Sequence, residues 1–374
     1  MHNVLAGRRV VLVHDWLTGM RGGEKVLESL CRLLPDAELL TLVHDKGSVC
    51  ALIESRRVRT SSIQRLPFPA RLYRHYLPLF PIAIEQFDLD DVDVVISTSH
   101  CAAKAVVPTG RALHISYSHS PMRYAWDQFD AYFGVERLGR WGHAVARRAL
   151  APIARWDRAT APRVDRFLAN SAHVAGRIAR YYNREATVLH PPVETRFFTP
   201  GTDGPGAYFL VVSALVPYKR LDTAIRAAAM LGAPVKIIGT GPDAARLHAL
   251  AGSDVEFLGH VDDDALRTLY RGARALLLPG EEDFGIAPVE AQACGRPVVA
   301  LGRGGACETV EDGVSGFLVH DESPEAFADA MSRVESLPLT AAEWHARASA
   351  FSVEQFERGL TQRVAETVAA PHAW

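Results

Sequence analysis

The sequence has no long hydrophobic run and few cysteines. No stretch of the 374 residues approaches the 18 or more apolar residues of a membrane-spanning helix. The apolar run at residues 10–13, which follows Arg8 and Arg9, is too short for a secretory signal. The five cysteines are an odd, scattered number without a C-x-x-C pair, which disfavours a disulfide framework and a cysteine metal site. These absences predict a cytoplasmic protein.

An excess of charge of one sign is also missing. The chain has 41 Lys and Arg against 43 Asp and Glu, a formal net charge of −2. No global basic field is available to hold nucleic acid by counterion release, so we expect no nucleic-acid partner and only local anion sites. Only five of the 41 cations are lysines. A lysine within a motif therefore indicates, weakly, a need for a compact ammonium group.

The pattern of the chain predicts an α/β protein with two doubly wound domains. Short apolar runs alternate with longer amphipathic segments, as parallel strands alternate with crossover helices. The length suits two domains of roughly 150 residues or more. The loop at residues 200–206, rich in Gly, Pro and Asp, separates two series of runs. The expected strands are 10–13, 92–97, 113–117, 166–170 and 187–189 in the first series, and 208–213, 235–238, 255–258, 275–278 and 297–300 in the second.

The strongest local motif lies at residues 279–295 (PGEEDFGIAPVEAQACG), after the expected strand 275–278. Pro288 suits the first turn of a helix that Gly295 ends. The amides of Phe284, Gly285 and Ile286 then lie at a helix N-terminus, which favours an anionic or hydroxyl-rich ligand.

Two carboxylates accompany this motif, because we expect Glu290 in the first helical turn and Glu282 in the loop. Together they can bind the hydroxyls of a diol. The alternative is a solvated loop acid and a helix acid that stabilises its first turn slightly.

The motif resembles the E-x7-E signature of the family 4 retaining glycosyltransferases, and further segments resemble that family in the expected order. They are Asn170-Ser171 and residues 189–193 (LHPPV), 216–222 (VPYKRLD), 237–242 (IIGTGP) and 257–261 (FLGHV). The resemblance implies the GT-B fold, in which two Rossmann-like domains enclose a sugar nucleotide. Residues 13–17 (VHDWL), 22–24 (GGE) and 119–124 (HSPMRY) are similar to the bacterial mannosyltransferase-like branch. We therefore expect domains at 1–195 (acceptor side) and 196–352 (donor side), and a helix at 353–374 that packs back on the first domain.

The resemblance also implies site residues. Glu290 would bind the ribose hydroxyls, Glu282 the donor sugar hydroxyls and Lys219 the diphosphate. His119 matches the family histidine near the donor sugar and the reaction centre. For Lys219 and His119 the alternatives are a solvated charge and a structural histidine.

Other positions complete the expected donor site. They are Gly22 and Gly23 as a glycine turn that brings backbone amides to the phosphates, and Gly239, Gly241 and Val261 near the nucleobase. The family usually has an arginine where this chain has Ala214. Either Arg220 or another basic group compensates, or diphosphate binding is weaker.

No metal or cofactor is expected. The resemblance implies a metal-independent enzyme. Two acidic triplets, Asp88-Leu89-Asp90 and Asp262-Asp263-Asp264, resemble the D-x-D metal motif of the other glycosyltransferase fold, but each has a structural explanation. Asp88-Leu89-Asp90 lies in a loop before a strand, and Asp262 suits the N-cap of a helix from Ala265.

The expected reaction transfers a sugar, with mannose from GDP-mannose favoured by the branch resemblance, to a saccharide or polyprenyl-linked saccharide with retention of configuration. The interleaved basic and aromatic residues at 56–80 suit an anionic membrane surface, so the protein is expected to be peripheral at the inner face of the plasma membrane. A solvated arginine face above core aromatics is an equal alternative. Two rival functions remain, a sugar-nucleotide epimerase of GT-B architecture and a non-catalytic nucleotide-sugar-binding module.

Overall fold

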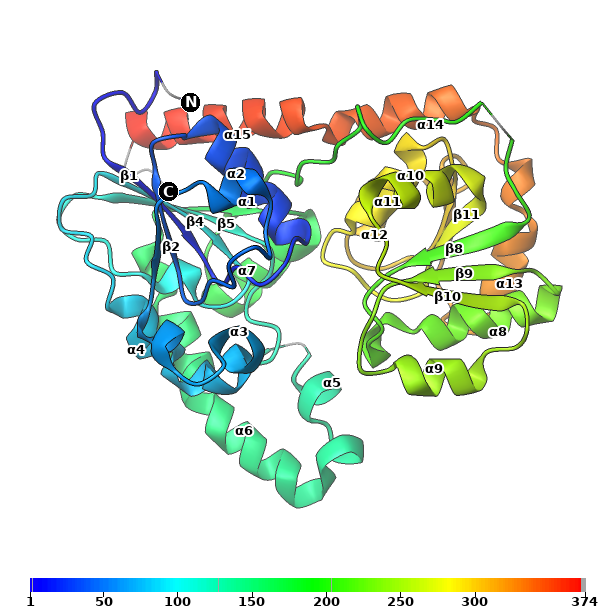
Figure 1. Cartoon of the computed structure of the whole chain (residues 1–374), viewed down its shortest axis with the longest axis horizontal. Helices are drawn as coiled ribbons and strands as arrows, with labels where there is room; N and C mark the ends of the chain where they lie inside the picture. Colours follow the sequence, from blue (N-terminus) through cyan, green and yellow to red (C-terminus); the bar gives the residue numbers. More distant parts are fainter. Residues whose placement is uncertain (2, 127, 203, 371–374) are drawn as a thin grey trace. The chain divides into compact units, whose positions relative to one another are not determined.

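Two parallel β-sheets organise the chain, each within its own unit (Figure 1). The computed structural model describes residues 1, 3–126, 128–202 and 204–370. Unit 1 comprises Met1–Pro192 and the chain from Phe356 onward, and unit 2 comprises Val193–Gln355. The prediction of two doubly wound α/β domains is confirmed, with unit 2 beginning at Val193.

Unit 1 contains a seven-stranded sheet in the order β3-β2-β1-β4-β5-β6-β7. Its strands are β1 Val10–His14, β2 Glu38–Thr41, β3 Val58–Thr60, β4 Val94–Ser99, β5 Leu113–Ser118, β6 Arg166–Ala169 and β7 Ala186–Val188. Its α-helices are α1 Gly22–Leu33, α2 Ala51–Glu54, α3 Pro69–Leu72, α4 Phe80–Glu85, α5 Phe129–Phe133, α6 Val135–Ala159, α7 Ala172–Tyr182 and α15 Val353–Ala369, and 3-10 turns lie at η1 Ser62–Arg65, η2 Tyr73–Leu79, η3 Ala103–Ala105 and η4 Ala161–Arg163.

The sheet of unit 1 is apolar on both faces, as a parallel sheet covered by helices must be. In β1, Val11 and Val13 point into one core, which α4 and α6 cover, whereas Leu12 points into the other. That second core contains residues of α1 and α15, which Figure 1 places on the same side of the sheet. Continuous apolar runs therefore become strands here because every residue has a layer to pack against.

Unit 2 contains a six-stranded sheet in the order β10-β9-β8-β11-β12-β13. Its strands are β8 Tyr208–Val212, β9 Val235–Ile238, β10 Val255–Gly259, β11 Ala273–Leu278, β12 Val298–Leu301 and β13 Gly316–Val319. Its α-helices are α8 Leu221–Leu231, α9 Ala244–Leu250, α10 Asp263–Gly272, α11 Ile286–Ala293, α12 Ala306–Thr309, α13 Pro324–Ser332 and α14 Ala341–Ala348, with 3-10 turns η5 Pro217–Lys219, η6 Val334–Ser336 and η7 Ser349–Phe351. Helices α8 and α13 pack on one face, and α11 and α14 on the other.

The sequence prediction missed three strands, β2, β3 and β13, and displaced the start of β4. These strands have only four, three and four residues, but length alone does not explain the difference, because β7 and β9, with three and four residues, were predicted. Strand β4 begins at Val94, not at Val92, because the chain turns at Val92, whose N–H donates to the carbonyl of Leu89.

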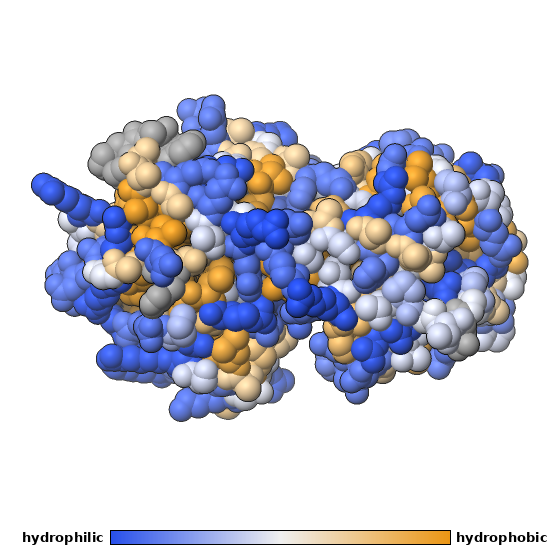
Figure 2. All heavy atoms as spheres, turned by 90° about the horizontal axis from the view of Figure 1, so that it is seen from above, coloured by the Kyte–Doolittle hydropathy of each residue, from blue (hydrophilic) through white to orange (hydrophobic). Residues whose placement is uncertain are grey.

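Helix α15 returns to unit 1, as expected. The expected helix began at residue 353, and the structure has Val353–Ala369. Phe356, Leu360 and Val364 are buried in the core of unit 1, at the four-residue spacing that places side chains on one helical face. On the face of the molecule in Figure 2, hydrophobic residues lie in small groups among hydrophilic ones. Among the described residues, none of the helices combines the length and apolar character needed to cross a bilayer.

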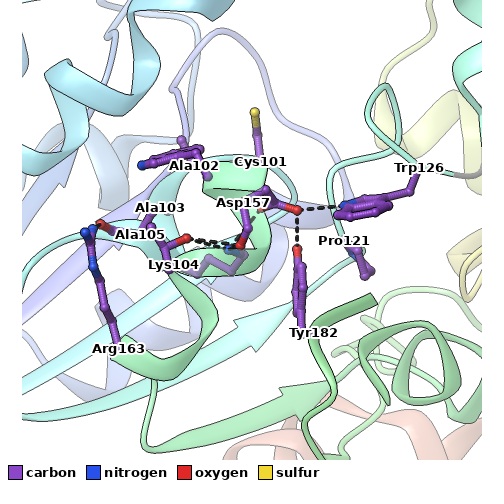
Figure 3. A network of polar contacts seen from close by, with 12 residues as sticks. Cys101, Ala102, Ala103, Lys104, Ala105, Pro121, Trp126, Asp157, Arg163 and Tyr182 are labelled. Atoms are coloured by element: carbon purple, nitrogen blue, oxygen red, sulfur yellow. Dashed lines mark hydrogen bonds and ion pairs between the residues drawn. The ribbon is translucent and has the colours of Figure 1, made fainter. Parts of the chain in front are cut away.

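A buried polar network ties the loop after β5 to helices α6 and α7 (Figure 3). The Asp157 carboxylate lies 3.0 Å from the Lys104 ammonium and accepts hydrogen bonds from Trp126 Nε1 at 2.8 Å and the Tyr182 hydroxyl at 2.9 Å. Lys104 also donates to the Asp157 carbonyl and to Thr160 Oγ1. Asp157 and Lys104 are 0% and 2% exposed, so each charge depends on the other.

We predict that Asp157→Asn lowers the free energy of unfolding of unit 1 by about 3–5 kcal/mol, because Lys104 then keeps a buried charge without its counter-ion. Hydrogen exchange of β4 and β5 in urea measures this unit by itself. The matched control is Asp91→Asn, which breaks the exposed Arg9–Asp91 pair and is expected to cost less than about 1 kcal/mol. Equal small effects in both variants would contradict the prediction, and Lys104→Met added to Asp157→Asn should restore part of the loss.

Candidate active site

The carboxyl ends of β1, β4 and β5 bring three histidines together in unit 1. The chain builds the sheet outward from β1 in one direction and from β4 in the other, so the strand order reverses between these two strands. Ligands of doubly wound sheets bind at such a point. His14 is the last residue of β1, His100 follows β4, and His119 follows β5. Their ring centroids are 6.5 Å apart for His14 and His100, and 6.3 Å apart for His100 and His119.

A buried carboxylate organises this edge. Asp15 is 0% exposed and accepts four backbone N–H groups, from His100 and Cys101 on Oδ2 at 2.7 and 3.0 Å and from Ala102 and Ala103 on Oδ1 at 2.6 and 2.7 Å. The His100 ring Nδ1 lies 3.1 Å from Oδ2. The loop after β4 is therefore anchored on one side chain.

The side chains of His14 and Glu24 support the glycine turn at the start of α1. His14 Nδ1 lies 2.5 Å from Thr98 Oγ1, and its Nε2 lies 3.5 Å from Glu24 Oε1. Glu24 Oε2 accepts the N–H of Arg21, which caps α1. Burial alone would raise the pKa of Glu24, but the hydrogen bond and charge of His14 outweigh it, and the pKa lies below its usual value.

The predicted glycine turn is confirmed in position, since α1 begins at Gly22. A Cβ atom on Gly23 would lie 3.5 Å from His119 Nε2 and 3.6 Å from His14 Cε1. Gly23 thus leaves a methyl-sized space beside two imidazoles. The His119 backbone is fixed as well, because its N–H donates to Ser99 and its carbonyl accepts from Asn170 Nδ2.

In unit 2 the structure brings Lys219 and Glu282 together. Lys219 ends the turn η5 and is 7% exposed, and its ammonium forms an ion pair with Glu282, whose side chain is 19% exposed. The alternative reading of two solvated charges is wrong. A buried cation in contact with a partly accessible carboxylate is suited to exchange that partner for a bound anion.

Close backbone contacts hold the Glu282 loop. A Cβ atom on Gly280 would lie 2.6 Å from Lys219 Cα, and one on Gly305 would overlap the backbone of Phe284. The Gly305 N–H donates to the Glu282 carbonyl at 2.8 Å. Glycine at these positions lets the loop lie directly against the segment that carries Lys219.

The helix after this loop starts earlier than Pro288 alone suggests. Helix α11 begins at Ile286 after Gly285, whose φ is +83°, and the Phe284 ring is buried against Phe351. The predicted N-terminal position of residues 284–286 is confirmed. Glu290 is the fifth residue of α11, so its placement in the first turn was wrong, because the loop enters the helix two residues before Pro288.

Tyr270 holds Glu290 in place. Its hydroxyl donates to Glu290 Oε2 at 2.8 Å. Burial, reinforced by the neighbouring Glu290 charge, raises the pKa of Tyr270 well above its usual value, so this phenol stays a donor.

The positions expected near the nucleobase meet at the ends of β9 and β10. The Gly239 N–H donates to the Gly259 carbonyl at 2.7 Å, and a Cβ atom on Gly241 would overlap Leu215. Val261 is half-buried and packs against the same core as β10. The two loops are thus adjacent, as expected.

Arg220 points to a carboxylate of its own. It lies in the left-handed region at φ +51° just before α8, and its Nη1 donates to Glu322 Oε2 at 2.8 Å. Arg303 contacts the other oxygen of Glu322 at 2.5 Å. Arg220 is therefore shared with this surface network. Whether Arg220 or another basic group takes the place of the family arginine at Ala214 stays a prediction.

The prediction that Asp262 is the N-cap of a helix is confirmed. Its Oδ1 accepts the N–H of Ala265 at 2.8 Å at the start of α10, which begins at Asp263, not at Ala265.

The sequence prediction assigned no role to His14, Asp15, Glu24 or His100. His14, Asp15 and His100 lie one to three residues after an apolar run that predicts a strand, and this is where a doubly wound sheet places ligand-binding side chains. That rule could have found them.

The protein-family model described as "Glycosyltransferase Family 4" matches residues 20–197, and the model described as "Glycosyl transferases group 1" matches residues 193–351. The fold and both matches define a family 4 glycosyltransferase of GT-B type. The chain belongs to this family.

Sequence relatives include D-inositol 3-phosphate glycosyltransferases. The one from Mycolicibacterium gilvum is 35% identical over 195 residues, 46% of this chain and 44% of the relative. The one from Salinispora arenicola is 32% identical over 295 residues, 62% of this chain and 65% of the relative. The match thus spans less than two thirds of the length of these relatives.

Solved structures with the same fold include Anabaena HepE in complex with UDP, with TM-score 0.68, 18% identity and coverage of 96% of this chain and 100% of that one. Sucrose-phosphate synthase from Thermosynechococcus elongatus has TM-score 0.74 and 17% identity, with coverage of 97% and 100%. The GT-B prediction is confirmed.

Proposed function

We propose that this protein is a retaining glycosyltransferase that moves a sugar from a nucleoside diphosphate donor to a saccharide or lipid-linked saccharide. The observation that carries this proposal is the ion pair between the buried Lys219 of η5 and Glu282 of the loop before α11, with Glu290 at the E-x7-E spacing. Membership of the family supports the same conclusion.

The proposed chemistry depends on charge that develops on the leaving group. As the bond between the anomeric carbon and the diphosphate breaks, negative charge grows on the diphosphate, and the Lys219 ammonium stabilises it. Glu282, released from Lys219 in part, accepts hydrogen bonds from sugar hydroxyls, and Glu290 binds the ribose. The acceptor hydroxyl attacks from the same face as the leaving group, and its proton passes to the departing diphosphate oxygen.

The proposal names the donor only as a nucleoside diphosphate sugar, without its base or its sugar. HepE was solved with UDP and with UDP-glucose, and the relatives described above are named for D-inositol 3-phosphate. None of these names supports GDP-mannose, which stays a prediction from the branch resemblance. A lipid-linked acceptor likewise stays a proposal.

A thermal-shift screen of UDP-glucose, UDP-GlcNAc, GDP-mannose and ADP-glucose tests this function. We expect one sugar nucleotide to raise the Tm, and nucleoside diphosphate release to require a saccharide acceptor. An epimerase would release the nucleotide without an acceptor, and a binding module would release none. Either result would overturn the proposal.

We predict that Lys219→Ala lowers transfer by about 10²- to 10³-fold through loss of leaving-group stabilisation, and that Glu290→Ala loses transfer as well, both with folding intact. Steady-state kinetics with the donor found in the screen measures this. Lys236→Ala is the matched control, because Lys236 pairs with Glu256 at 3.3 Å and is 30% exposed. Wild-type turnover in Lys219→Ala or Glu290→Ala would refute the site assignment.

The basic and aromatic segment 56–80 divides into two parts. Tyr73, Leu77 and Phe80 are buried in the core of unit 1, as the solvated-face alternative expects. Phe68 is 73% exposed, and several arginines around it are exposed as well, namely Arg65, Arg71 and Arg74. This exposed part supports our proposal that unit 1 binds an anionic membrane surface.

We expect the protein to float with vesicles that contain phosphatidylglycerol at low salt, and Phe68→Ser combined with Arg71→Glu to reduce the bound fraction severalfold. The control Met230→Ser removes another exposed apolar side chain, in unit 2, and should change nothing. Absence of flotation at low salt would end the membrane proposal.

A further inference from the structure

His100 lies at the candidate site of unit 1, and the proposed function gives this residue no role. Its ring packs edge-to-face on the buried Trp16, with centroids 4.5 Å apart, and lies beside His119. The side chain is 29% exposed, whereas Asp15 beneath it is fully buried. One edge of the imidazole is therefore fixed by the protein and part of the ring is accessible.

The Asp15 contact determines which nitrogen carries the proton. Nδ1 lies 3.1 Å from Asp15 Oδ2, where an N–H is attracted to the carboxylate and a lone pair would be repelled. The neutral ring thus keeps its proton on Nδ1 and presents a lone pair on Nε2. Among the residues that the structure describes, Nε2 of His100 has no hydrogen-bond partner.

Burial, more than the charges around it, keeps the His100 ring neutral. Burial lowers its pKa below the ordinary value of 6.5, and the attraction of Asp15 and of Glu24 opposes this only in part. His14 and Arg123 lower the pKa further, and the His119 ring also faces this side. At neutral pH the ring is a hydrogen-bond acceptor at a fixed position.

We propose that His100 Nε2 accepts a hydrogen bond from a hydroxyl of the sugar that the donor carries. This inference rests on the proposed function. The choice of the donor sugar follows from the neighbours of His100, which are His119, expected beside the donor sugar, and the His14–Gly23 corner, expected beside the diphosphate. A neutral acceptor suits a hydroxyl, which must donate, and does not suit a phosphate.

The test compares a sugar nucleotide with its bare nucleotide. Titration calorimetry with UDP-glucose against UDP, and GDP-mannose against GDP, is carried out on the full chain and on two variants. His100→Phe keeps the ring packing on Trp16 and removes Nε2, and should weaken the sugar nucleotide about 10-fold while leaving the nucleoside diphosphate unchanged. His100→Gln restores an acceptor oxygen and should recover part of the loss.

His44→Gln is the matched control, because His44 forms another histidine–carboxylate pair in unit 1, with Glu54 at 3.2 Å, outside this cluster. It should bind both ligands as the wild type does. Deoxy analogues of the bound sugar extend the comparison, since the hydroxyl that contacts His100 should matter in the wild type and not in His100→Phe.

A pH series provides a second readout. Protonation turns Nε2 into a donor, so the preference for sugar nucleotide over bare nucleotide should fall more steeply in the wild type than in His100→Phe as the pH drops below 6.5. His14, His119 and Glu24 are present in both proteins and cancel in this comparison.

The outcomes separate the inference from the function it rests on. Unchanged sugar-nucleotide affinity in His100→Phe would overturn the inference and would leave the proposed function standing. Equal losses for UDP and UDP-glucose would indicate a merely structural role and would also overturn it. A wild type that binds no sugar nucleotide would overturn the proposed function, and this inference with it.

Discussion

The buried carboxylate of Asp15 is the interaction on which the candidate site of unit 1 depends. Strands β1 and β4 pair in register, with His14 opposite Thr98, so the chain leaves both strands at the same level. The residue after β1 is Asp15, and its two side-chain oxygens accept the four N–H groups that the turn after β4 would otherwise leave without partners. Charge-assisted bonds of this kind are short and strong. The orientation of His100 follows from them, because its own backbone N–H is one of the four.

The carboxylate at the other candidate site is satisfied in a different way. Glu282 has as its partner the ammonium of Lys219, on a loop that glycine contacts hold in place. Four backbone amides cannot leave Asp15 without unfolding the turn. One ammonium can turn to a phosphate oxygen at little cost, because the new partner is also an anion. Asp15 thus fixes the turn after β4 rigidly, whereas the single ion pair of Glu282 with Lys219 is consistent with the exchange of partners that we propose.

Sequence patterns predicted what is local and missed what only strand pairing creates. The apolar runs in the centre of each sheet and the motif at residues 279–295 are local, and strands such as β9 and helix α11 were found. Strand β3 has three residues and lies at the edge of the sheet, where β2 is its one neighbour. Asp15 and His100 are 85 residues apart, and their contact exists only because β1 pairs with β4. Glu290 lies in the second turn of α11 and not in the first, because the helix starts directly after Gly285. The presence of Pro288 does not reveal the conformation of Gly285.

Two of the five lysines, Lys104 and Lys219, have buried side chains, and their surroundings differ. Lys104 and Lys219 are both buried beside a carboxylate, at 2% and 7% exposure. The ammonium of Lys104 has the Asp157 carboxylate, the Asp157 carbonyl and Thr160 Oγ1 as partners, which matches its three N–H groups. Lys219 has Glu282 as its one anionic partner among the described residues, and an aromatic ring, Tyr218, at 5.2 Å. A saturated ammonium can only support structure. The ammonium of Lys219 has donors to spare and is buried next to a partly accessible carboxylate. It is therefore the one of the two that suits the diphosphate role we propose, and this difference, more than the rarity of lysine, distinguishes Lys219.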